Sequence, residues 1–526
     1  MKSTQLYKMI QELHEKKLES GNFGDLFQID GIPLWYFFQG FINSSFLPAP
    51  FRPLWVIEKE IKNGFPPKTG IKSRLLAFTL KKGLTLNEWI KHVIAKRDEK
   101  EQKKGKKDVL FIVLTNQIRQ KKDGLEFLEC GGVLSSLERY KKIKPLILVG
   151  DPFSKNSLFK LRRYGPLIYH YITPEIIAKS RQLSKELNER WKRLDEDDKR
   201  KLFTYRGRNY WKFFECNMNI LFSKEFLFTL IKYYLTCKEI LLKHDIKVVY
   251  LTSLTNFYDL SLLGAASKLE KTVVYSSHGY TRGTVGGWKL LKNVIFAAGG
   301  AEHKKDLLAN GVKKENIVVT GFPFLDEIAS YIRKRKSKTG GKTVSLLTTT
   351  VVESKFMEKK KYFALIREVL KQLKEVPEIK KIIIKLHPAE KHRAEYEKIA
   401  RSLGMKHVNV TQKTGRSFLY EVINESDALI GFGSTAILEG LVFDKDAIHL
   451  KPLESRPVFE FESATYLVKN IDELAKSIRN VLNNNATKRE LRLRRRKYLN
   501  RSFYKIDGKS SMRIADLIAS LVGKNR

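Results

Sequence analysis

The stretch "IIIKLHPAEK" at residues 382–391 decides how the fold of this chain is interpreted. Its three consecutive isoleucines are typical of a strand that is buried on both faces of a parallel sheet. His387 and Pro388 follow at once, and the next residues have the composition of a helix that stops at Gly404. Proline fits the first turn of a helix, where its missing N–H costs nothing. The stretch therefore predicts a strand-to-helix junction of an α/β domain, with His387 at that junction.

Short apolar runs of the same kind recur along the chain and form two series. The first series lies at 108–115, 145–150, 167–172, 247–253, 272–277, 293–300 and 316–321. The second lies at 343–350, 381–388, 407–412, 427–435, 447–450 and 465–468. Segments with helical spacing, such as 210–243, separate many of these runs. The pattern predicts an α/β protein with two Rossmann-like, doubly wound domains that face a cleft.

A basic segment marks the expected boundary between the two domains. Residues 331–342, "YIRKRKSKTGGK", contain six basic residues, no acid and a glycine pair. The predicted organisation places a helical, aromatic-rich extension first, then an N-terminal Rossmann-like domain, a C-terminal Rossmann-like domain and a C-terminal helix, at residues 1–100, 101–332, 340–505 and 506–526.

The aromatic segment 32–55 has two interpretations. We expect it to pack on the following domain, because it is rich in aromatic residues and has few charges. The alternative is an interfacial patch that contacts a membrane. The cations nearest to it in the sequence are Lys72, Arg74, Lys81 and Lys82.

The charge of the chain indicates an anionic partner. The 526 residues include 99 Lys and Arg against 57 Asp and Glu, a formal net charge of +42. Such a field attracts nucleic acid, anionic lipid or phosphate-bearing substrates, although a lysine-rich surface alone would give the same number. Nucleic acid is not expected, because neither a zinc-finger nor an RNP pattern is present. The basic segment 488–505 is either a solvated helix face or a contact for a polyanionic acceptor or a membrane surface.

The remaining composition favours a cytoplasmic protein without a metal centre. Three scattered cysteines and the lack of a CxxC pair give neither a disulfide framework nor a zinc site. The first residues have no signal-peptide core, and no apolar run approaches the length of a membrane span. We expect a cytoplasmic location, with peripheral contact to an anionic inner membrane face as an open alternative.

Two stretches of the second domain have the residue types of an anion site. His387, with Lys385 beside it, is expected at a strand end and at the positive end of a helix. In "DALIGFGSTAILEGL", Gly433 permits close backbone approach, and Ser434 and Thr435 open a helix. Glu439 follows one turn inside, where a carboxylate suits ribose or sugar hydroxyls. The plain alternatives are a structural histidine and an ordinary serine cap.

The first domain offers two further candidate stretches. His278 follows a strand in "VVYSSHGYTRG", and Arg282 lies in the same glycine-bearing loop. Asp123, after the first strand, is the candidate carboxylate that would activate an acceptor. Each of these has a plain turn as its structural alternative.

Together, several stretches resemble the GT-B transferases that build bacterial and archaeal surface polymers. That grouping contains capsule polysaccharide synthesis transferases, CDP-glycerol glycerophosphotransferases and polysialyltransferases. The resemblance covers roughly residues 245–520. It is carried by "SSHG" (276–279), "GVKKENIVVTGFPFLDE" (311–327), "KLHP" (385–388), "GSTAILEGL" (433–441) and the ending "YKIDGKSSMRIADLI" (504–518).

The resemblance implies a metal-independent glycosyltransferase, or a glycerophosphotransferase-like enzyme, with a GT-B-like fold. It implies that His387 contacts the donor phosphate, that Ser434 and Thr435 hold phosphate oxygens, and that Glu439 holds the ribose. His278 or Asp123 would be the base. The implied partners are a nucleotide-activated donor of CMP, CDP or UDP type and a glycan or lipid-linked acceptor, with no separate cofactor. The alternatives are a UDP-sugar 2-epimerase-like enzyme with the same fold and a non-catalytic polyanion-binding protein.

Overall fold

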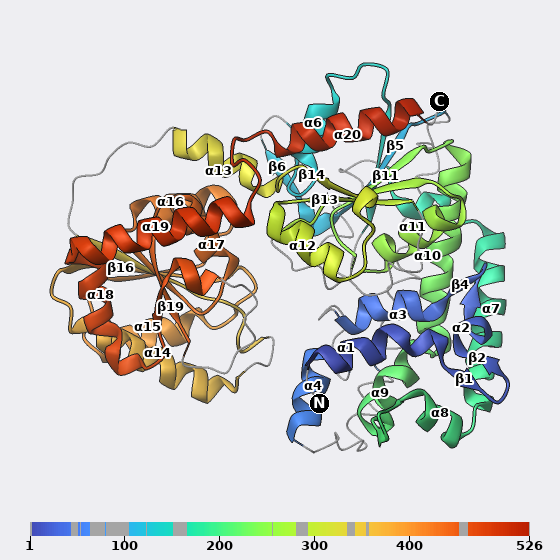
Figure 1. Ribbon diagram of the computed structural model, residues 1–526, viewed down its shortest axis with the longest axis horizontal. Helices are drawn as coiled ribbons and strands as arrows, with labels where there is room; N and C mark the ends of the chain where they lie inside the picture. The colour runs from blue at the N-terminus through green and yellow to red at the C-terminus, as the bar shows by residue number, and fades with distance from the viewer. Residues whose placement is uncertain are drawn as a thin grey trace. The chain divides into compact units, whose positions relative to one another are not determined.

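The computed structural model of the chain consists of two compact units, each with its own parallel sheet. It describes residues 3–43, 51–52, 54–63, 79, 105–121, 124–150, 166–254, 256–279, 293–333, 342–353, 357–451 and 461–524. The first unit contains residues 1–298, 305–318 and 511–526, and the second contains residues 299–304 and 319–510. The last helix of the chain, α20 (Ser510–Lys524), thus belongs almost entirely to the first unit (Figure 1).

The first unit has a six-stranded parallel sheet in the order β14-β13-β12-β11-β5-β8. Its strands are β5 (Val109–Leu114), β8 (Pro145–Gly150), β11 (Val248–Leu251), β12 (Thr272–Tyr275), β13 (Val294–Ala298) and β14 (Ile317–Val319). The strand order reverses between β5 and β11, so the ligand-binding edge of this sheet is expected at the carboxyl ends of these two strands.

Helices and short hairpins surround this sheet. The helices are α1 (Ser3–Glu12), α2 (Phe23–Leu26), α3 (Leu34–Asn43), α4 (Leu54–Asn63), α6 (Gly131–Leu137), α7 (Pro174–Arg193), α8 (Glu196–Leu202), α9 (Trp211–Leu221), α10 (Lys224–Lys243), α11 (Phe257–Lys268) and α12 (Ala301–Ala309). The hairpins are β1–β2 (Lys17–Leu18, Gly21–Asn22), β3–β4 (Gln28–Ile29, Ile32–Pro33), β6–β7 (Ile118–Lys121, Gly124–Phe127) and β9–β10 (Thr204–Tyr205, Arg208–Asn209).

The aromatic segment after residue 32 is part of the core, as expected. Phe37, Phe38 and Phe41 on α3 are fully buried. The approach of α3 to α11 is close, because a Cβ at Gly40 would lie 2.7 Å from a Leu260 methyl carbon. The membrane-facing alternative is therefore wrong for α3. The basic residues 72, 74, 81 and 82 lie outside the described part of the chain.

One expected strand is absent from the first sheet. The run 167–172 forms a 3₁₀ turn over Ile168–Tyr171, and Leu167 alone bridges to Val149 of β8. The reason is that its tyrosines find buried partners on helices. Tyr169 bonds to the hydroxyl of Tyr258 at 2.8 Å, and Tyr171 bonds to the His244 ring at 2.8 Å.

The second unit has a parallel sheet in the order β17-β16-β15-β18-β19-β20. Counted along the chain, this is the Rossmann order 3-2-1-4-5-6. Its strands are β15 (Lys342–Leu347), β16 (Ile379–Lys385), β17 (Val408–Thr411), β18 (Ala428–Gly431), β19 (Asp446–Leu450) and β20 (Tyr466–Val468). All six runs predicted for this domain are strands. Both faces of the sheet are buried, which explains why the runs are continuous rather than alternating.

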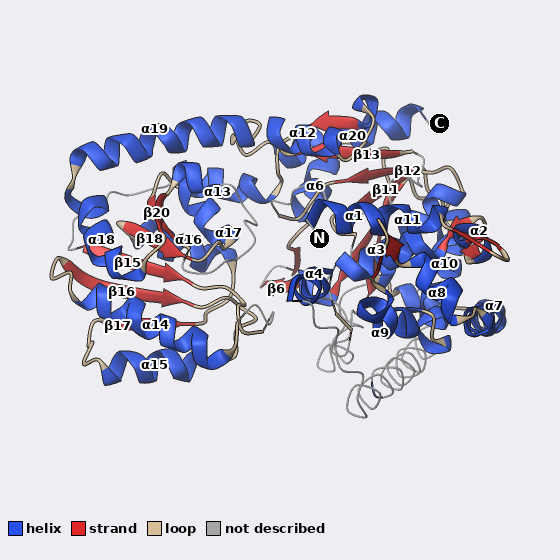
Figure 2. Cartoon of the chain, turned by 60° about the horizontal axis from the view of Figure 1, so that its bottom comes forward, coloured by secondary structure: helices blue, strands red, loops and turns tan. Residues whose placement is uncertain are grey.

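Seven helices belong to this unit among the residues described. They are α13 (Phe324–Arg333), α14 (Lys359–Lys374), α15 (Arg393–Ser402), α16 (Arg416–Glu425), α17 (Thr435–Val442), α18 (Leu474–Asn483) and α19 (Asn485–Ser502). In Figure 2, α14 and α15 lie on one side of the strands and α13 and α19 on the other. One core cluster joins α14, α15 and α18 to alternate residues of the sheet.

Candidate functional site

The two stretches predicted to bind an anion both begin at the carboxyl edge of the second sheet. Leu347 of β15 pairs with Lys385 on one side and with Gly431 on the other. The segments that follow β16 and β18 therefore start two strand spacings apart, roughly 10 Å. The strand order reverses between β15 and β18, and open α/β sheets bind ligands at such a point.

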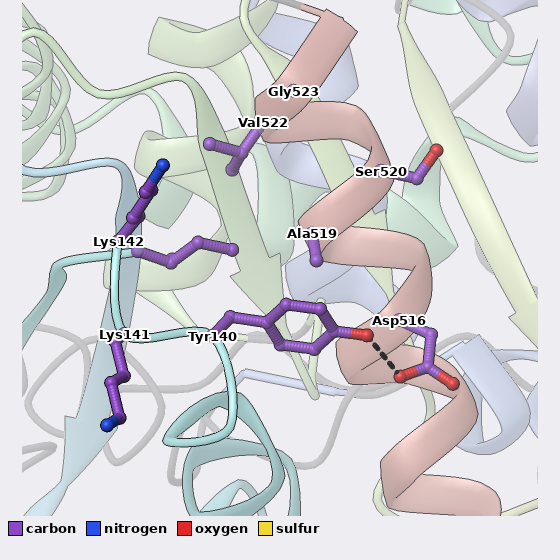
Figure 3. Close-up of a pocket in the computed structure, with 9 residues that line it drawn as sticks. Tyr140, Lys141, Lys142, Asp516, Ala519, Ser520, Val522 and Gly523 are labelled. Carbon is purple, nitrogen blue, oxygen red and sulfur yellow. Dashed lines mark hydrogen bonds between the residues drawn. The ribbon is translucent and has the colours of Figure 1, made fainter.

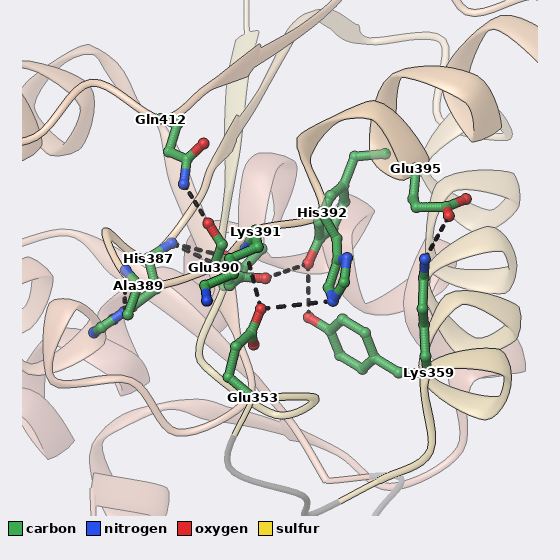
Figure 4. A network of polar contacts seen from close by, with 12 residues as sticks. Glu353, Lys359, His387, Ala389, Glu390, Lys391, His392, Glu395 and Gln412 are labelled. Carbon is green, nitrogen blue, oxygen red and sulfur yellow. Dashed lines mark hydrogen bonds and ion pairs between the residues drawn. The ribbon is translucent and has the colours of Figure 1, made fainter. Parts of the chain in front are cut away.

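His387 lies in a turn and not at the start of a helix, so this part of the prediction is wrong. The helix α15 begins at Arg393, six residues later. The cause is Glu390, whose side chain is buried and accepts a hydrogen bond from the His387 backbone N–H at 2.8 Å. The hydroxyls of Thr348 and Tyr396 also donate to this carboxylate (Figure 4). A helix dipole therefore does not contribute at His387.

The hydrogen bonds of His387 determine which ring nitrogen carries the proton. The Ala389 backbone N–H donates to Nδ1 at 3.1 Å, so Nδ1 is an acceptor and the proton lies on Nε2. Burial lowers the pKa of this half-buried ring, and the charge of Lys385 lowers it further, against a smaller opposing effect of Glu353. His387 is therefore a neutral imidazole that presents an Nε2–H donor, which suits a phosphate oxygen.

Lys385 is less available than its sequence position suggests. Its side chain is buried, and Nζ donates to the Leu386 carbonyl at 2.6 Å. Burial lowers the pKa of this amine, against the attraction of Glu390. Lys385 therefore acts on the site through its charge beside His387.

The start of α17 has the predicted form. Ser434 is the N-cap, and its Oγ accepts from the Ala436 N–H at 3.2 Å. Thr435 is exposed in the first turn. Gly433 has φ +100°, and an added Cβ would lie 3.9 Å from His449 Nε2 as its nearest neighbour. Ser434 already occupies two amides of this helix start, because its Oγ accepts from the Ala436 N–H and its carbonyl accepts from the Ile437 N–H at 3.0 Å. The exposed Thr435 hydroxyl is therefore the polar group of this helix start that faces solvent.

Glu439 is a buried carboxylate with an unused oxygen. It is 7% exposed, and its Oε2 has no hydrogen-bond partner in the described structure. Burial raises the pKa of Glu439 to about 7, although Arg416 attracts the charged form and Glu327 repels it. Tyr420 beside it has a raised pKa, mainly through burial, and its buried hydroxyl likewise lacks a partner among the described residues. Buried polar atoms usually have a hydrogen-bond partner, so both atoms are available to a ligand group or to a water molecule.

Residues 311–327, one of the stretches that resemble the surface-polymer transferases, end in α13, whose side chains lie near Glu439. Glu327 contributes to the raised pKa of Glu439, and Phe324 lies under the Arg416 guanidinium, 5.9 Å from its ring centroid. The Asp326 carboxylate accepts from the Ser510 N–H at 2.9 Å, which ties the first residue of α20 to α13. The segment therefore contributes to the surroundings of Glu439 through Glu327 and Phe324.

In the first unit, His278 lies at the carboxyl edge of β12, next to β11. Its Nδ1 lies 3.0 Å from the Thr252 carbonyl oxygen, which can only accept, so Nδ1 carries the proton. The exposed Nε2 is then a free basic lone pair, the reverse of the arrangement in His387. This tautomer is the one that a general base requires.

Glu129 joins this edge, and the sequence analysis missed it. The Thr252 hydroxyl donates to Glu129 Oε2 at 2.7 Å. Asp259 lies nearby, fully buried, and burial together with the Glu129 charge raises the pKa of Asp259 to about 8. The β6–β7 hairpin folds the chain back so that Glu129 reaches Thr252. An acid directly before Cys130-Gly131-Gly132 was the only local signal.

Two predicted residues cannot be placed. Asp123 and Arg282 lie outside the described residues. Glu129 is therefore the half-buried carboxylate that the structure does place at the strand edge where an activating acid was expected.

A cavity of about 560 Å³ lies elsewhere in the first unit. It is bordered by residues 140–143 and by α20 (Figure 3). The Tyr140 hydroxyl donates to Asp516 at 2.6 Å, and Arg139 pairs with the same carboxylate at 2.9 Å. The cavity contains none of the predicted site residues.

The described ranges contain neither a cluster typical of a metal centre nor a helix typical of a membrane span. No group of three or more His, Cys, Asp or Glu residues there could hold a metal ion. No helix in those ranges is long and apolar enough to cross a bilayer.

Two Rossmann-like parallel sheets in one chain define a GT-B-like fold, which confirms the predicted fold class. Residues 293–519, less than half of the chain, match the family model of UDP-N-acetylglucosamine 2-epimerase. This range contains the whole second sheet and its edge residues. No protein of curated function matches the chain significantly.

Several solved structures share the fold at low identity. The UDP-GlcNAc 2-epimerase of Methanocaldococcus jannaschii is 15% identical, with a TM-score of 0.45 over 78% of this chain and 99% of that one. The Neisseria meningitidis enzyme bound to UDP-GlcNAc is 12% identical, with a TM-score of 0.47 over 78% and 100%. The wall teichoic acid polymerase TagF is 11% identical, with a TM-score of 0.42 over 86% and 96%. The family match over residues 293–519 supports an enzyme.

Proposed function

We propose that the protein is an enzyme that acts on a nucleotide-activated sugar, whose nucleotide binds at the carboxyl edge of the second sheet. One observation carries the proposal: the Nε2–H of His387, the open helix start at Thr435 and the orphaned carboxylate of Glu439 belong to the same sheet edge. Amide and imidazole donors suit diphosphate oxygens, and a carboxylate suits ribose hydroxyls. The family match over this same region supports a UDP-sugar.

The leaving group sets the chemistry that this edge would perform. When the bond between the sugar and the diphosphate breaks, negative charge grows on the phosphate oxygens. Donors that are already oriented stabilise this charge without reorganising, and the loss of one typically costs about 10²–10³ in rate. His387 Nε2–H and the exposed Thr435 hydroxyl are these donors. Glu439 would bind the ribose hydroxyls and so position the nucleotide.

For the reaction itself, we propose first a conversion like that of a UDP-sugar 2-epimerase. The match of residues 293–519 favours this over the transferase that the sequence motifs suggested. Inversion at C2 requires a base that removes the C2 proton and an acid that returns a proton to the opposite face. The sugar–diphosphate bond that breaks must re-form with the same UDP, so that no atom is gained or lost. His278, with its free Nε2 lone pair, is the candidate base of the first unit, and Thr252 and Glu129 position it.

The second candidate is transfer of a sugar or polyol phosphate to a glycan or lipid-linked acceptor. The motifs "SSHG", "KLHP" and "GSTAILEGL" favour it. The nucleotide site of the second unit would serve this reaction as well, and His278 of the first unit is the candidate base for the acceptor hydroxyl. The site proposal is therefore common to both reactions, and they differ in what receives the sugar.

One experiment distinguishes the two reactions. The purified chain is incubated with UDP-GlcNAc alone, and the sugar is followed by proton NMR while free UDP is measured by chromatography. Formation of the C2 epimer without acceptor supports the epimerase. Turnover of the donor only after addition of a cell-envelope acceptor fraction supports the transferase. If none of UDP-GlcNAc, CDP-glycerol and CMP-, CDP- or GDP-sugars binds or is turned over, the proposed function is wrong.

A further inference from the structure

The outward face of α19 carries four cations around one leucine. Arg489, Arg492, Leu493, Arg496 and Lys497 are all exposed, and their spacing places them on one side of the helix. Leu493 is 62% exposed, the highest value among the large hydrophobic residues that the structure describes. The face thus combines positive charge with an apolar side chain directed into water.

The opposite face fixes the rotation of the helix. Leu491, Arg495 and Tyr498 are buried there. The Arg495 guanidinium donates to the Asp444 carboxylate at 3.0 Å and to the Asp446 carboxylate at 2.8 Å. Two carboxylates on one guanidinium hold α19 in a single orientation. The basic face is therefore presented by a firmly held helix.

The cations of this face are not neutralised by the protein. Arg489, Arg492, Arg496 and Lys497 make no hydrogen bond or ion pair with any residue that the structure describes, whereas Arg494 donates to backbone carbonyls beside β20. Like charges three and four residues apart destabilise a helix. An anionic partner would remove this repulsion.

We propose that this face of α19 docks on an anionic lipid surface. The guanidinium and ammonium groups would contact lipid phosphates, and Leu493 would enter the boundary of the acyl chains. The leucine favours lipid over a hydrated polyanion, because a polyanion in water offers no apolar phase to bury it. The proposal does not depend on which reaction the protein catalyses.

The test uses the full chain and flotation with lipid vesicles. One set of vesicles contains phosphatidylcholine with one-third phosphatidylglycerol, and the other contains phosphatidylcholine alone. We expect binding to the anionic vesicles only, at about 0.1 M salt, and release at about 1 M salt. The double substitution Arg492→Glu with Arg496→Glu should lower the partition coefficient at least about 25-fold, from about fivefold for each lost cation. Leu493→Ser should lower it about tenfold.

A matched control has the same change in net charge elsewhere on the second unit. Lys360→Glu with Lys406→Glu replaces two exposed lysines for which no side-chain contact is described. It should keep most of the binding. Circular dichroism and thermal melting verify that each variant folds.

Three results would overturn the proposal. The first is no binding of the unmodified chain to anionic vesicles at the lower salt concentration. The second is an equal loss of binding in the control, which would assign the attraction to the general field of the chain. The third is unchanged vesicle binding after Leu493→Ser together with tight binding of single-stranded DNA through Arg492 and Arg496, which would identify a polyanion site.

Discussion

Replacement of Glu439 by glutamine should change how the stability of the protein depends on pH. Burial raises the pKa of this carboxyl from its ordinary 4.5 to about 7 in the folded chain. Below about pH 4.5 the carboxyl is protonated in both the folded and unfolded states and has no effect. Between these two values only the unfolded state releases the proton, so the free energy of unfolding decreases as the pH rises. Above about pH 7 the loss reaches its full size, about 3 kcal/mol.

Glutamine has the same shape and does not titrate. Glu439→Gln should therefore match the unmodified chain at about pH 5 and exceed it at about pH 8 by up to about 3 kcal/mol. For a unit of this size, that corresponds to roughly 6–12 °C in melting temperature. Thermal and urea unfolding, followed by circular dichroism across this range, measure the difference.

The same substitution should weaken nucleotide binding. A ribose hydroxyl donates to a carboxylate more strongly than to an amide oxygen, so added UDP should raise the melting temperature less in the variant. Glu421→Gln is the matched control, because Glu421 is an exposed acid on the neighbouring α16. The reasoning fails if the difference between Glu439→Gln and the unmodified chain stays constant from about pH 5 to pH 8.

Substitutions at four other residues give distinct expected outcomes. His387→Ala should lower turnover about 10²–10³-fold with the fold intact, measured by donor consumption and circular dichroism, and a normal rate would exclude the assigned role. Glu390→Ala should destabilise the chain by about 1–3 kcal/mol in urea unfolding, because the His387 N–H and two hydroxyls lose their acceptor. His278→Ala should lower turnover with the fold intact, and a normal rate would point to another base. Ser434→Ala should cost about 1 kcal/mol of stability through the lost cap, whereas Ser434→Gly should cost only a few tenths.

The sequence determined the strands of the second sheet and the start of α17. Continuous β-branched runs mark strands buried on both faces, and Gly433-Ser434 marks a helix start whose cap bond is local. These features depend on neighbours in the chain, so the sequence alone predicts them. The fold class followed from their alternation with helices.

Tertiary structure decided the rest. His387 lies in a loop and not at the predicted helix start, because the buried Glu390 carboxylate accepts hydrogen bonds from the His387 N–H and from the hydroxyls of Thr348 and Tyr396. The segment 167–172 does not form the predicted strand, because Tyr169 and Tyr171 bond to Tyr258 and His244. The opposite tautomers of His278 and His387 follow from which backbone group each Nδ1 meets, and the raised pKa of Glu439 follows from its burial. Apart from the His387 tautomer, which the Ala389 N–H two residues away determines, these features depend on atoms distant in the chain, whose proximity exists only after folding.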